Sequence, residues 1–494
     1  MRRARFLAIA CVLLLCSKVF GEEDLGRMLE MYRQSSYADH AQRLRDYETL
    51  QAMRRANGER HLPAGTQFDF TRESIRKTRS NAPGADVNGC AWTSAGPTNI
   101  NGRVISLAVD PVEKQNMYAG TVGGLWRSQT GGRRWQRVSD EIMLAQRFSA
   151  VAVNPVKTNE IFAGAGDRNL SIYEKGNGLW MSTAHGAPGT WFQPTKAFNN
   201  IIIYRIRIDP DPASNDIWVA ATNGVWRGKH NANGGVDFDV PFKGFTRLTH
   251  DLAIDFSSTP RTIYAGVRKD WDDPAKPVGI YKTDSSANTV WDKKDSGIDL
   301  SMAETLSLAL SESNPSILYT KVSHINGTMA GVYTTTTAAE PGNDGTAWDV
   351  LPFSEGNGLL ADEGMCWFNT LIEVDPKDPL RVYAGGMNMW MSVDGGQEWE
   401  NISPGKDPKY HNDAHSDFHT LAFDPDDPKI LFVGNDGGID RADFADPEWH
   451  WTDASHGMVI SMFNYLVSNR KYPTLLAGGL QDNGTVITFG NRTW

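Results

Sequence analysis

The densest group of side chains able to do acid–base or metal chemistry lies in the run HNDAHSDFH, residues 411–419. Its His and Asp residues all fall at odd positions. In an extended strand, alternate side chains project from one face about 6.5–7 Å apart, so His415, Asp417 and His419 would face the same way. A set of this kind suits a divalent first-row metal ion. A hydrogen-bonded polar lining without metal fits the same pattern, and both interpretations stay open.

Two Gly-rich segments further along the chain add carboxylates. GNDGG contains Asp436, and GLQDNG contains Asp482. Asp-Gly and Asn-Gly are strong signals for hairpin turns, so a structural role in turns is one interpretation of both aspartates. A shared binding site with Asp417 is the other.

The elements that must position these residues repeat about eight times. The first copy reads RVISLAVDP, MYAG, GGLWRS and GGRRW over residues 103–135, and later copies repeat pairs such as AVAVNP with IFAG and LAFDP with LFVG. A period near 45 residues that holds several short strands is typical of a β-propeller. We therefore expect an all-β fold, a single β-propeller of seven or eight four-stranded blades, preceded by a short helical segment.

Each copy begins with a strand that alternates apolar and small residues and ends at Asp-Pro or Asn-Pro, where Pro breaks the ladder. Trp135 is expected to open the outermost strand of the first blade. The predicted innermost strands lie near 104–109, 149–153, 203–208, 250–254, 305–310, 370–374, 418–423 and 463–468.

Alignment of the copies on the Asp-Pro turn predicts which side chains line the central channel. Positions seven and five residues before the turn share strand parity and should face one way. These positions, the His/Asp run and the two Gly-rich turns together predict a ligand site at the channel mouth. Asp417 should lie in the same layer as Arg103 and Arg147. The predicted ligand-binding residues are Arg103, Arg147, Tyr204, His250, His415, Asp417, His419, Asp436 and Asp482.

One copy contains a sharper motif. The segment SVDGGQEW, residues 392–399, fits the pattern Ser-x-Asp-x-Gly-x-x-Trp, and residues 128–135 repeat it with Thr130 in place of Asp. Residues 90–494 thus resemble the Asp-box (BNR-repeat) propellers. In such a motif, Asp394 is expected to hydrogen-bond the backbone of its own hairpin.

The HSDFH, NDGG and GLQDNG segments are similar to motifs of exported sortilin-like propellers, and a more distant resemblance is to the two-propeller xyloglucanases. Sortilin-like propellers capture peptides and proteins. In xyloglucanases, one catalytic Asp directly precedes a Gly-Gly pair in the first blade, whereas Thr121 and Val122 stand there in this chain. We therefore expect no catalytic residues and a non-catalytic role in binding a protein, peptide or glycan. A glycoside hydrolase acting on polysaccharide is the alternative.

The net charge and the amino-terminal residues indicate which partners and which cellular location to expect. The net charge of −10 disfavours a nucleic-acid partner, because phosphate binding needs a basic face. Residues 1–21 combine Arg2, Arg3 and Arg5 with a short apolar run, which is typical of a secretory signal peptide. No other stretch is apolar enough to span a membrane. We expect an exported monomer, secreted or periplasmic.

The predicted organisation is a signal peptide over 1–21, a helical segment over 22–60, a linker over 61–89 and the propeller over 90–494. Cys90 and Cys366 are expected to be buried thiols. Two interpretations of the ends stay open. Residues 90–97 complete the last blade, or the chain is a piece of a longer protein that continues beyond Trp494.

Overall fold

The computed structural model describes residues 96–139, 147–167, 176–270, 273, 275–286, 290–338, 347–352, 365–403, 414–445, 448–469, 471–472 and 474–494. The chain divides into two compact units, Met1–Glu59 and Arg60–Trp494, and every described residue belongs to the second. The predicted signal peptide, helical segment and linker, Cys90, and residues 411–413 lie outside the described residues. Within these ranges, no helix is long and apolar enough to cross a membrane.

The described residues form eight antiparallel sheets, each built from strands consecutive in the chain. The first four are β1 (Val104–Val109) to β4 (Trp135–Arg137) with β2 (Met117–Thr121) and β3 (Gly124–Ser128); β5 (Phe148–Val153), β6 (Ile161–Ala165) and β7 (Leu179–Ser182); β8 (Ile203–Ile208), β9 (Ile217–Ala221), β10 (Gly224–His230) and β11 (Val236–Pro241); and β12 (Thr249–Asp255), β13 (Thr262–Val267), β14 (Gly279–Asp284) and β15 (Asp292–Lys293). A short 3-10 helix, η1 (Phe242–Gly244), follows β11.

The remaining four sheets follow the same order along the chain. They are β16 (Ala303–Leu310), β17 (Leu318–His324), β18 (Met329–Thr335) and β19 (Asp349–Val350); β20 (Ile372–Val374), β21 (Val382–Gly385), β22 (Met389–Ser392) and β23 (Glu400–Asn401); β24 (Thr420–Phe423), β25 (Ile430–Asn435), β26 (Gly438–Ala445) and β27 (Glu448–Asp453); and β28 (Phe463–Ser468), β29 (Leu475–Leu480) and β30 (Thr485–Phe489).

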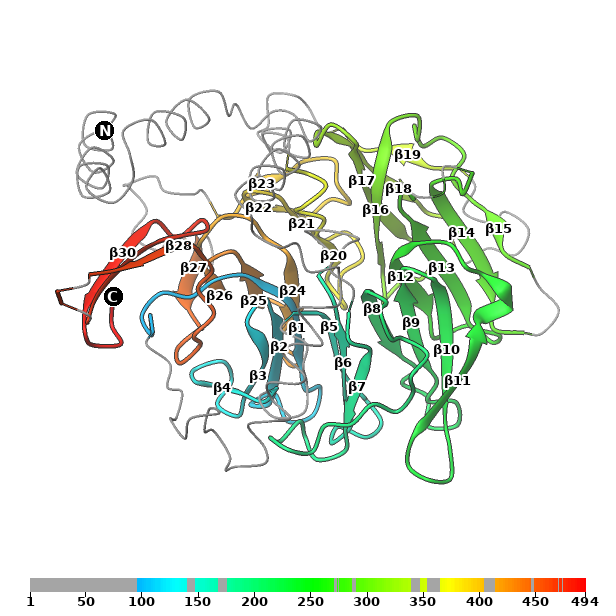
Figure 1. The fold of residues 1–494 in the computed structure, drawn as a ribbon. Coiled ribbons are helices and arrows are strands. Elements are labelled where there is room, and N and C mark those ends of the chain that lie inside the picture. The colour runs from blue at the N-terminus through cyan, green and yellow to red at the C-terminus, as the bar shows by residue number, and fades with distance from the viewer. Residues whose placement is uncertain are drawn as a thin grey trace. The chain divides into compact units, whose positions relative to one another are not determined.

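The first seven sheets, blades 1 to 7, form a closed ring in the described part of the chain. Their first strands are innermost, and β1 packs beside both β5 and β24 (Figure 1). One apolar cluster joins blade 1 to blade 7, through Val104 and Trp126 on one side and Phe432 and Ile439 on the other. Side-chain packing between sheets, rather than a shared strand, closes the propeller.

The repeated Asp-Pro turns add polar links between blades at the outer end of the innermost strands. In six of the described turns the side chain of the first residue accepts backbone N–H groups two or three positions ahead, as Asp110 does from Val112 and Glu113 at 2.9 Å. Across the closure, Lys114 Nζ lies 2.7 Å from Asp426 of blade 7. The turn residue therefore shapes its own turn and prepares contacts with the next blade.

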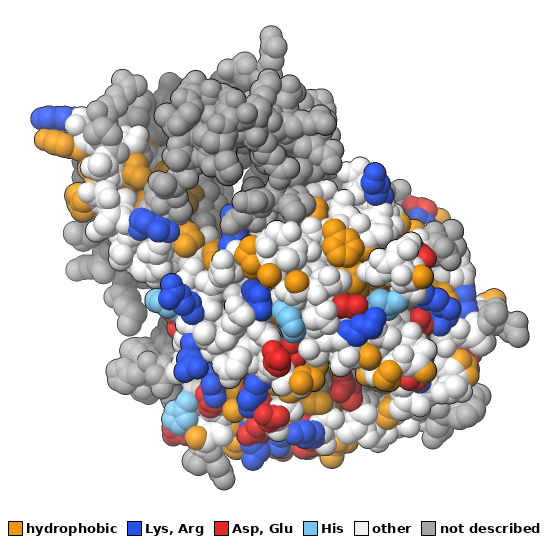
Figure 2. Space-filling view, turned by 90° about the horizontal axis from the view of Figure 1, so that it is seen from below, with side chains coloured by type: hydrophobic (Ala, Val, Ile, Leu, Met, Phe, Trp, Pro, Cys, Tyr) orange, Lys and Arg blue, Asp and Glu red, His pale blue; other side chains and the backbone are white. Residues whose placement is uncertain are grey.

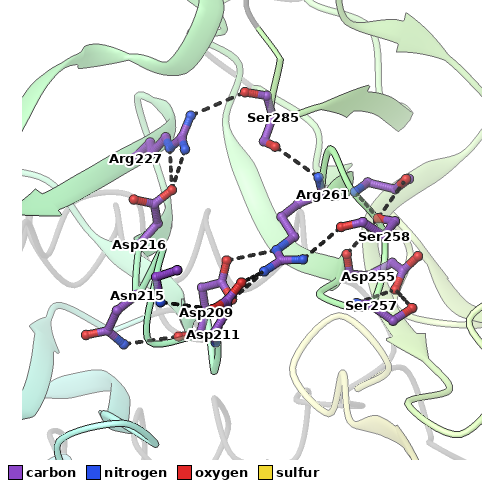
Figure 3. Close-up of polar contacts among 12 residues, drawn as sticks. Asp209, Asp211, Asn215, Asp216, Arg227, Asp255, Ser257, Ser258, Arg261 and Ser285 are labelled. Carbon is purple, nitrogen blue, oxygen red and sulfur yellow. Dashed lines mark hydrogen bonds and ion pairs between the residues drawn. The ribbon is translucent and has the colours of Figure 1, made fainter.

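The link between blades 3 and 4 is the most extensive of these turn contacts (Figure 3). Arg261 Nε donates to Asp209 at 2.9 Å, and its Nη2 donates to Asp211 at 2.8 Å. Nearby, Arg227 Nε donates to Asp216 at 2.7 Å within blade 3. Blade 3 thus supplies the carboxylates and blade 4 supplies the guanidinium that crosses between them.

The eighth sheet does not join the ring, which corrects the expectation that residues 463–468 lie on the propeller axis. Strand β28 is largely exposed, with Tyr465 67% and Leu466 54% accessible, whereas β1 is almost fully buried. The physical reason is that the ring already closes between β24 and β1, which leaves no inner position for β28. The described strands therefore form a ring of seven blades.

The amino-terminal segment ties the eighth sheet to the ring. Thr98 N–H donates to Arg492 O at 2.8 Å, and Asn99 Nδ2 donates to Trp494 O at 3.0 Å. Ser461 Oγ donates to Ile100 O at 2.5 Å. Residues 98–100 therefore contact the eighth sheet and the segment before it, whereas the predicted completion of the last blade by residues 90–97 stays a prediction. Residues 90–95 lie outside the described residues.

The Asp-box hairpin has the expected hydrogen bonds. Asp394 Oδ1 accepts the N–H groups of Gln397 at 2.9 Å and Glu398 at 3.0 Å, and it also accepts from Ser392 Oγ. Burial alone would raise the pKa of Asp394, but these hydrogen bonds lower it. The turn of blade 1 keeps the serine contacts of the motif, because Ser128 Oγ accepts the N–H of Gly132 at 3.1 Å.

Candidate functional site

A buried ion-pair cluster lies at the channel mouth, where blades 1 and 7 meet. Arg103, directly before β1, donates through Nε to Asp436 Oδ1 at 2.5 Å and through Nη2 to Oδ2 at 3.0 Å. His419, directly before β24, places Nε2 2.7 Å from the same Oδ1. All three side chains are at least 98% buried. A bidentate arginine–carboxylate pair fixes both position and orientation.

Within this cluster, the negative charge of Asp436 is stabilised by Arg103 and His419. Burial would raise the pKa of Asp436, but the adjacent His419 and Arg103 hold it well below its usual range. The guanidinium of Arg103 also stacks 4.5 Å above the ring of Phe368, whose edge contacts His419 at a centroid distance of 4.8 Å. Nη1 of Arg103 is buried without a hydrogen-bond acceptor.

A second, more accessible layer lies over this cluster. The β29–β30 turn of the eighth sheet brings Asp482 to within 3.7 Å of Arg103 Nη2, and that carboxylate is 42% exposed. His415 Nε2 lies 3.3 Å from the backbone oxygen of Asp482. Asn483 Nδ2 donates to the backbone oxygen of Asp436 at 3.0 Å. The eighth sheet therefore contributes to the mouth although it stands outside the ring.

Both accessible aspartates have perturbed acidity and an unusual backbone. Burial and the neighbouring Asp436 raise the pKa of Asp482 to about 6. Burial raises the pKa of Asp417 above its ordinary value, against a 2.7 Å hydrogen bond from Asn369. Asp417 and Asp482 have φ of 69° and 60°, in the left-handed region that few non-glycine residues adopt. The fold thus holds both carboxylates in specific turns at one mouth.

The other predicted ligand residues do not converge on this cluster. Arg147 pairs with the buried Asp167 at 2.9 Å. Tyr204 and His250 are buried, with ring centroids 5.4 Å apart. Of the nine predicted ligand residues, four have side chains that are at least partly exposed, namely Arg147, His415, Asp417 and Asp482.

Within the described residues, His415, Asp417 and His419 do not converge as the predicted metal site requires. Strand β24 begins only at Thr420, and the positive φ of Asp417 breaks the extended geometry that the prediction requires. His415 faces Asp482, Asp417 accepts from Asn369, and His419 faces Asp436. Within the described ranges, no three His, Cys, Asp or Glu side chains could hold a metal ion together.

An ion-pair network that the sequence did not predict crosses the channel itself. Arg205 of blade 3 donates through Nε to Asp251 of blade 4 at 2.7 Å and through Nη2 to Glu373 of blade 6 at 3.0 Å. Burial would raise the pKa of Asp251, but Arg205 lowers it to about 2. The described channel is therefore bridged by charged side chains below the mouth.

The reason for this miss is a β-bulge in the innermost strands. In blades 1 to 4 the strand register shifts at the position five residues before the Asp-Pro turn, which is Ile105, Ser149, Tyr204 and His250 in turn. A bulge adds a residue and re-aims the side chains beyond it. Strand parity counted from the turn therefore does not carry through to the mouth. No sequence signal marks the bulge, although charge at the next position, as in Arg205 and Asp251, was visible.

The turn of blade 1 that would hold a carboxylate in a xyloglucanase-like enzyme has a structural role. Thr121 is fully buried, and its Oγ1 donates to Gly124 O at 2.8 Å and accepts from the N–H of Gly123 at 3.0 Å. Val122, also buried, follows it. The carboxylates of the mouth come instead from blade 7 and the eighth sheet.

Solved structures with a similar fold include enzymes of family GH74. An enzyme from Niastella koreensis matches with a TM-score of 0.56 and 19% identity over 80% of this chain and 60% of its own. An ancestral GH74 enzyme matches with a TM-score of 0.58 and 17% identity, over 82% of this chain and 55% of its own. The GH74 xyloglucanase of Xanthomonas campestris matches with a TM-score of 0.55 and 16% identity, over 82% of this chain and 68% of its own.

This likeness identifies the chain as a β-propeller and shows the fold alone. The chain spans 60% of the length of the Niastella koreensis enzyme. No protein-family model matches the sequence. No curated protein matches it either.

Proposed function

We propose that this chain is an exported β-propeller that binds a protein, peptide or glycan ligand at its channel mouth without catalysing a reaction. The observation that carries the proposal is the pair Asp417 and Asp482. Both are accessible, both are held in left-handed turns, and both lie beside His415 at one mouth. Unusual backbone conformations of this kind concentrate at binding sites.

The layer beneath supports a binding role. Arg103, Asp436 and His419 are buried and contact one another, although Nη1 of Arg103 has no hydrogen-bond acceptor. We infer that they position the turns above them. The accessible groups are hydrogen-bond acceptors and an imidazole. They suit a ligand rich in hydroxyl or amide N–H donors, as glycans and extended peptides are.

The second candidate is a glycoside hydrolase, favoured by the divergent acidity of two neighbouring carboxylates. The pKa of Asp436 is depressed and that of Asp482 is raised to about 6. Such a separation is the usual basis for assigning a general base and a general acid. Against this, Asp436 is fully engaged by Arg103 and His419, which leaves it neither exposed nor mobile.

The two candidates are separated by parallel binding and turnover measurements on the mature chain. Glycan and peptide arrays identify a ligand, and calorimetry then compares wild type with Asp417→Asn, Asp482→Asn and the surface control Asp443→Asn. We expect both mouth variants to lose affinity, the control to keep it, and xyloglucan, β-glucans and sialosides to remain intact. Hydrolysis that disappears in Asp482→Asn or Asp417→Asn would assign the chain to the enzymes instead.

A further inference from the structure

A second concave site lies away from the channel mouth, between the outer parts of blades 3 and 4. It has a volume of about 630 Å³, within the range of small-molecule sites. Residues of η1 and the segment before β12 form one wall, including Lys243 and Arg247. Residues of β14 and the segments before β14 and β15 form the other, including Tyr281 and Trp291. The site shares no residue with the mouth.

Aromatic rings form a fixed floor. Phe245 stacks on Trp291 with ring centroids 4.2 Å apart and an interplanar angle of 29°. It also meets Tyr281 edge-on at 5.4 Å. Trp291 Nε1 donates to Phe242 O at 3.2 Å, which anchors the indole. An apolar, planar surface of this kind is already arranged before any ligand arrives.

Three basic side chains surround the aromatic floor, and they differ in their partners. Lys243 Nζ donates to Asp284 O and Thr283 Oγ1, and Lys276 Nζ lies 3.5 Å from both Asp270 and Asp273. Arg247 instead lies 4.9 Å above the ring of Tyr281. Among the described residues, no carboxylate forms an ion pair with Arg247. A guanidinium that is held by a ring and has no counter-ion among the described residues is well placed to bind a planar anion bidentately.

We propose that this cleft binds an acidic saccharide, with the carboxylate of a hexuronate residue on Arg247 and the apolar face of the sugar ring on the Trp291 floor. The combination of the Arg247 guanidinium with a flat aromatic surface favours a ring that carries a carboxylate over a flexible acidic peptide. Val290 at the rim is 70% exposed, so the cleft is open to a chain that continues on either side.

The test is calorimetric titration of the mature chain with a short oligogalacturonate, its methyl ester and polyglutamate. Arg247→Gln should weaken oligogalacturonate binding about tenfold or more, because a charge-assisted bidentate contact is worth roughly 1.5–3 kcal/mol. The exposed control Arg134→Gln should bind like wild type, and the methyl ester should bind weakly to all variants. Added salt should weaken the acidic ligand's binding.

A second pair of variants protects the test against a folding defect. Val290→Asp should weaken and Val290→Lys should strengthen oligogalacturonate binding, since both change the charge at the rim without touching the aromatic floor. Unchanged affinity in Arg247→Gln together with indifference to the charge at position 290 would overturn the proposal. Tighter binding of polyglutamate than of oligogalacturonate would overturn the saccharide assignment in favour of an acidic peptide.

Discussion

At the scale of single residues, the channel mouth separates positioning groups from accessible ones. Asp436 neutralises Arg103 in a buried environment, and Asp482 reaches the same guanidinium from the solvent side. The buried pair stabilises the fold only while both partners are present, because an isolated buried charge is costly.

Asp436→Asn should therefore destabilise the protein by about 3–5 kcal/mol, since Arg103 would remain buried with a neutral partner. Urea unfolding at neutral pH measures the change. The matched control is Asp443→Asn, which breaks the more exposed pair with Arg441 and should cost less than about 1 kcal/mol. Equal losses in the two variants would show that Arg103 finds another partner.

The pH dependence of stability gives a second residue-scale prediction, at Asp440. Burial and the cross-strand neighbour Asp453 raise the pKa of Asp440 to about 6, although Asn435 Nδ2 donates to it at 2.6 Å. Between the ordinary value near 4 and about 6, the folded state binds more protons than the unfolded state. This group's contribution is therefore present below pH 4 and is lost as the pH rises to 6.

Asp440→Asn should remove that dependence. The variant's melting temperature should fall less than that of wild type between pH 4 and pH 6, measured by calorimetry in buffers of equal ionic strength. A variant profile parallel to that of wild type would mean that other groups carry the titration.

At the scale of elements, hydrogen bonds within its own turn hold the hairpin over 392–399. Asp394→Ala should cost about 1 kcal/mol for the lost turn hydrogen bonds, measured by chemical unfolding, and should leave ligand affinity unchanged. Thr130→Ala in the blade 1 copy should cost less, because Thr130 accepts no backbone N–H in its turn. Loss of binding without loss of stability in Asp394→Ala would move this residue from scaffold to site.

Two glycines in equivalent strands report on where the propeller closes. A Cβ on Gly434 of β25 would lie 2.6 Å from Thr420 and 2.9 Å from Val104, across the joint between blades 7 and 1. A Cβ on Gly479 of β29 would meet nothing within 4 Å. Gly434→Ala should therefore destabilise by about 1–3 kcal/mol, and Gly479→Ala should be near neutral, both measured by thermal unfolding. A reversed order would place the closing joint at the eighth sheet.

At the scale of the whole second unit, the ring and the eighth sheet differ in how they are held. Each ring blade packs its faces on two neighbours, whereas β28 is largely exposed and its sheet is tied by the turn at 481–484 and by residues 98–100. The outer surface seen in Figure 2 mixes acidic and basic side chains, in keeping with the ion pairs at the turns rather than with a single-sign binding face.

Amide hydrogen exchange of the protein should resolve this difference. We expect the amides of β28 and β30 to exchange much faster than those of β1 and β16, because local opening of a sparsely packed sheet needs less free energy than opening of the ring. Uniform protection of all eight sheets would indicate that the eighth is as firmly packed as a blade.

The repeat could be read from the sequence, and with it the propeller and the innermost strands of blades 1 to 7, whose limits are correct to within two residues. Asp-Pro turns, period-two alternation and Gly pairs are local signals that act within a few residues. The same local chemistry identified Asp394 as a turn residue and placed Asp436 and Asp482 in Gly-rich turns. Those features needed no knowledge of what lies across the molecule.

The contacts that those residues make depend on parts of the chain that lie far away in the sequence. The bulges at Tyr204 and His250 change which side chains face the channel, on which the predicted lining depended. The left-handed backbone of Asp417 prevents the extended geometry that the predicted metal ligands need. Closure after seven blades excluded β28 from the ring and sent Asp482 over Arg103 from outside it. Contacts between residues several hundred positions apart determine these features. The free energy of a buried charge, or of the packing between blades 7 and 1, depends on neighbours that a local sequence pattern does not specify.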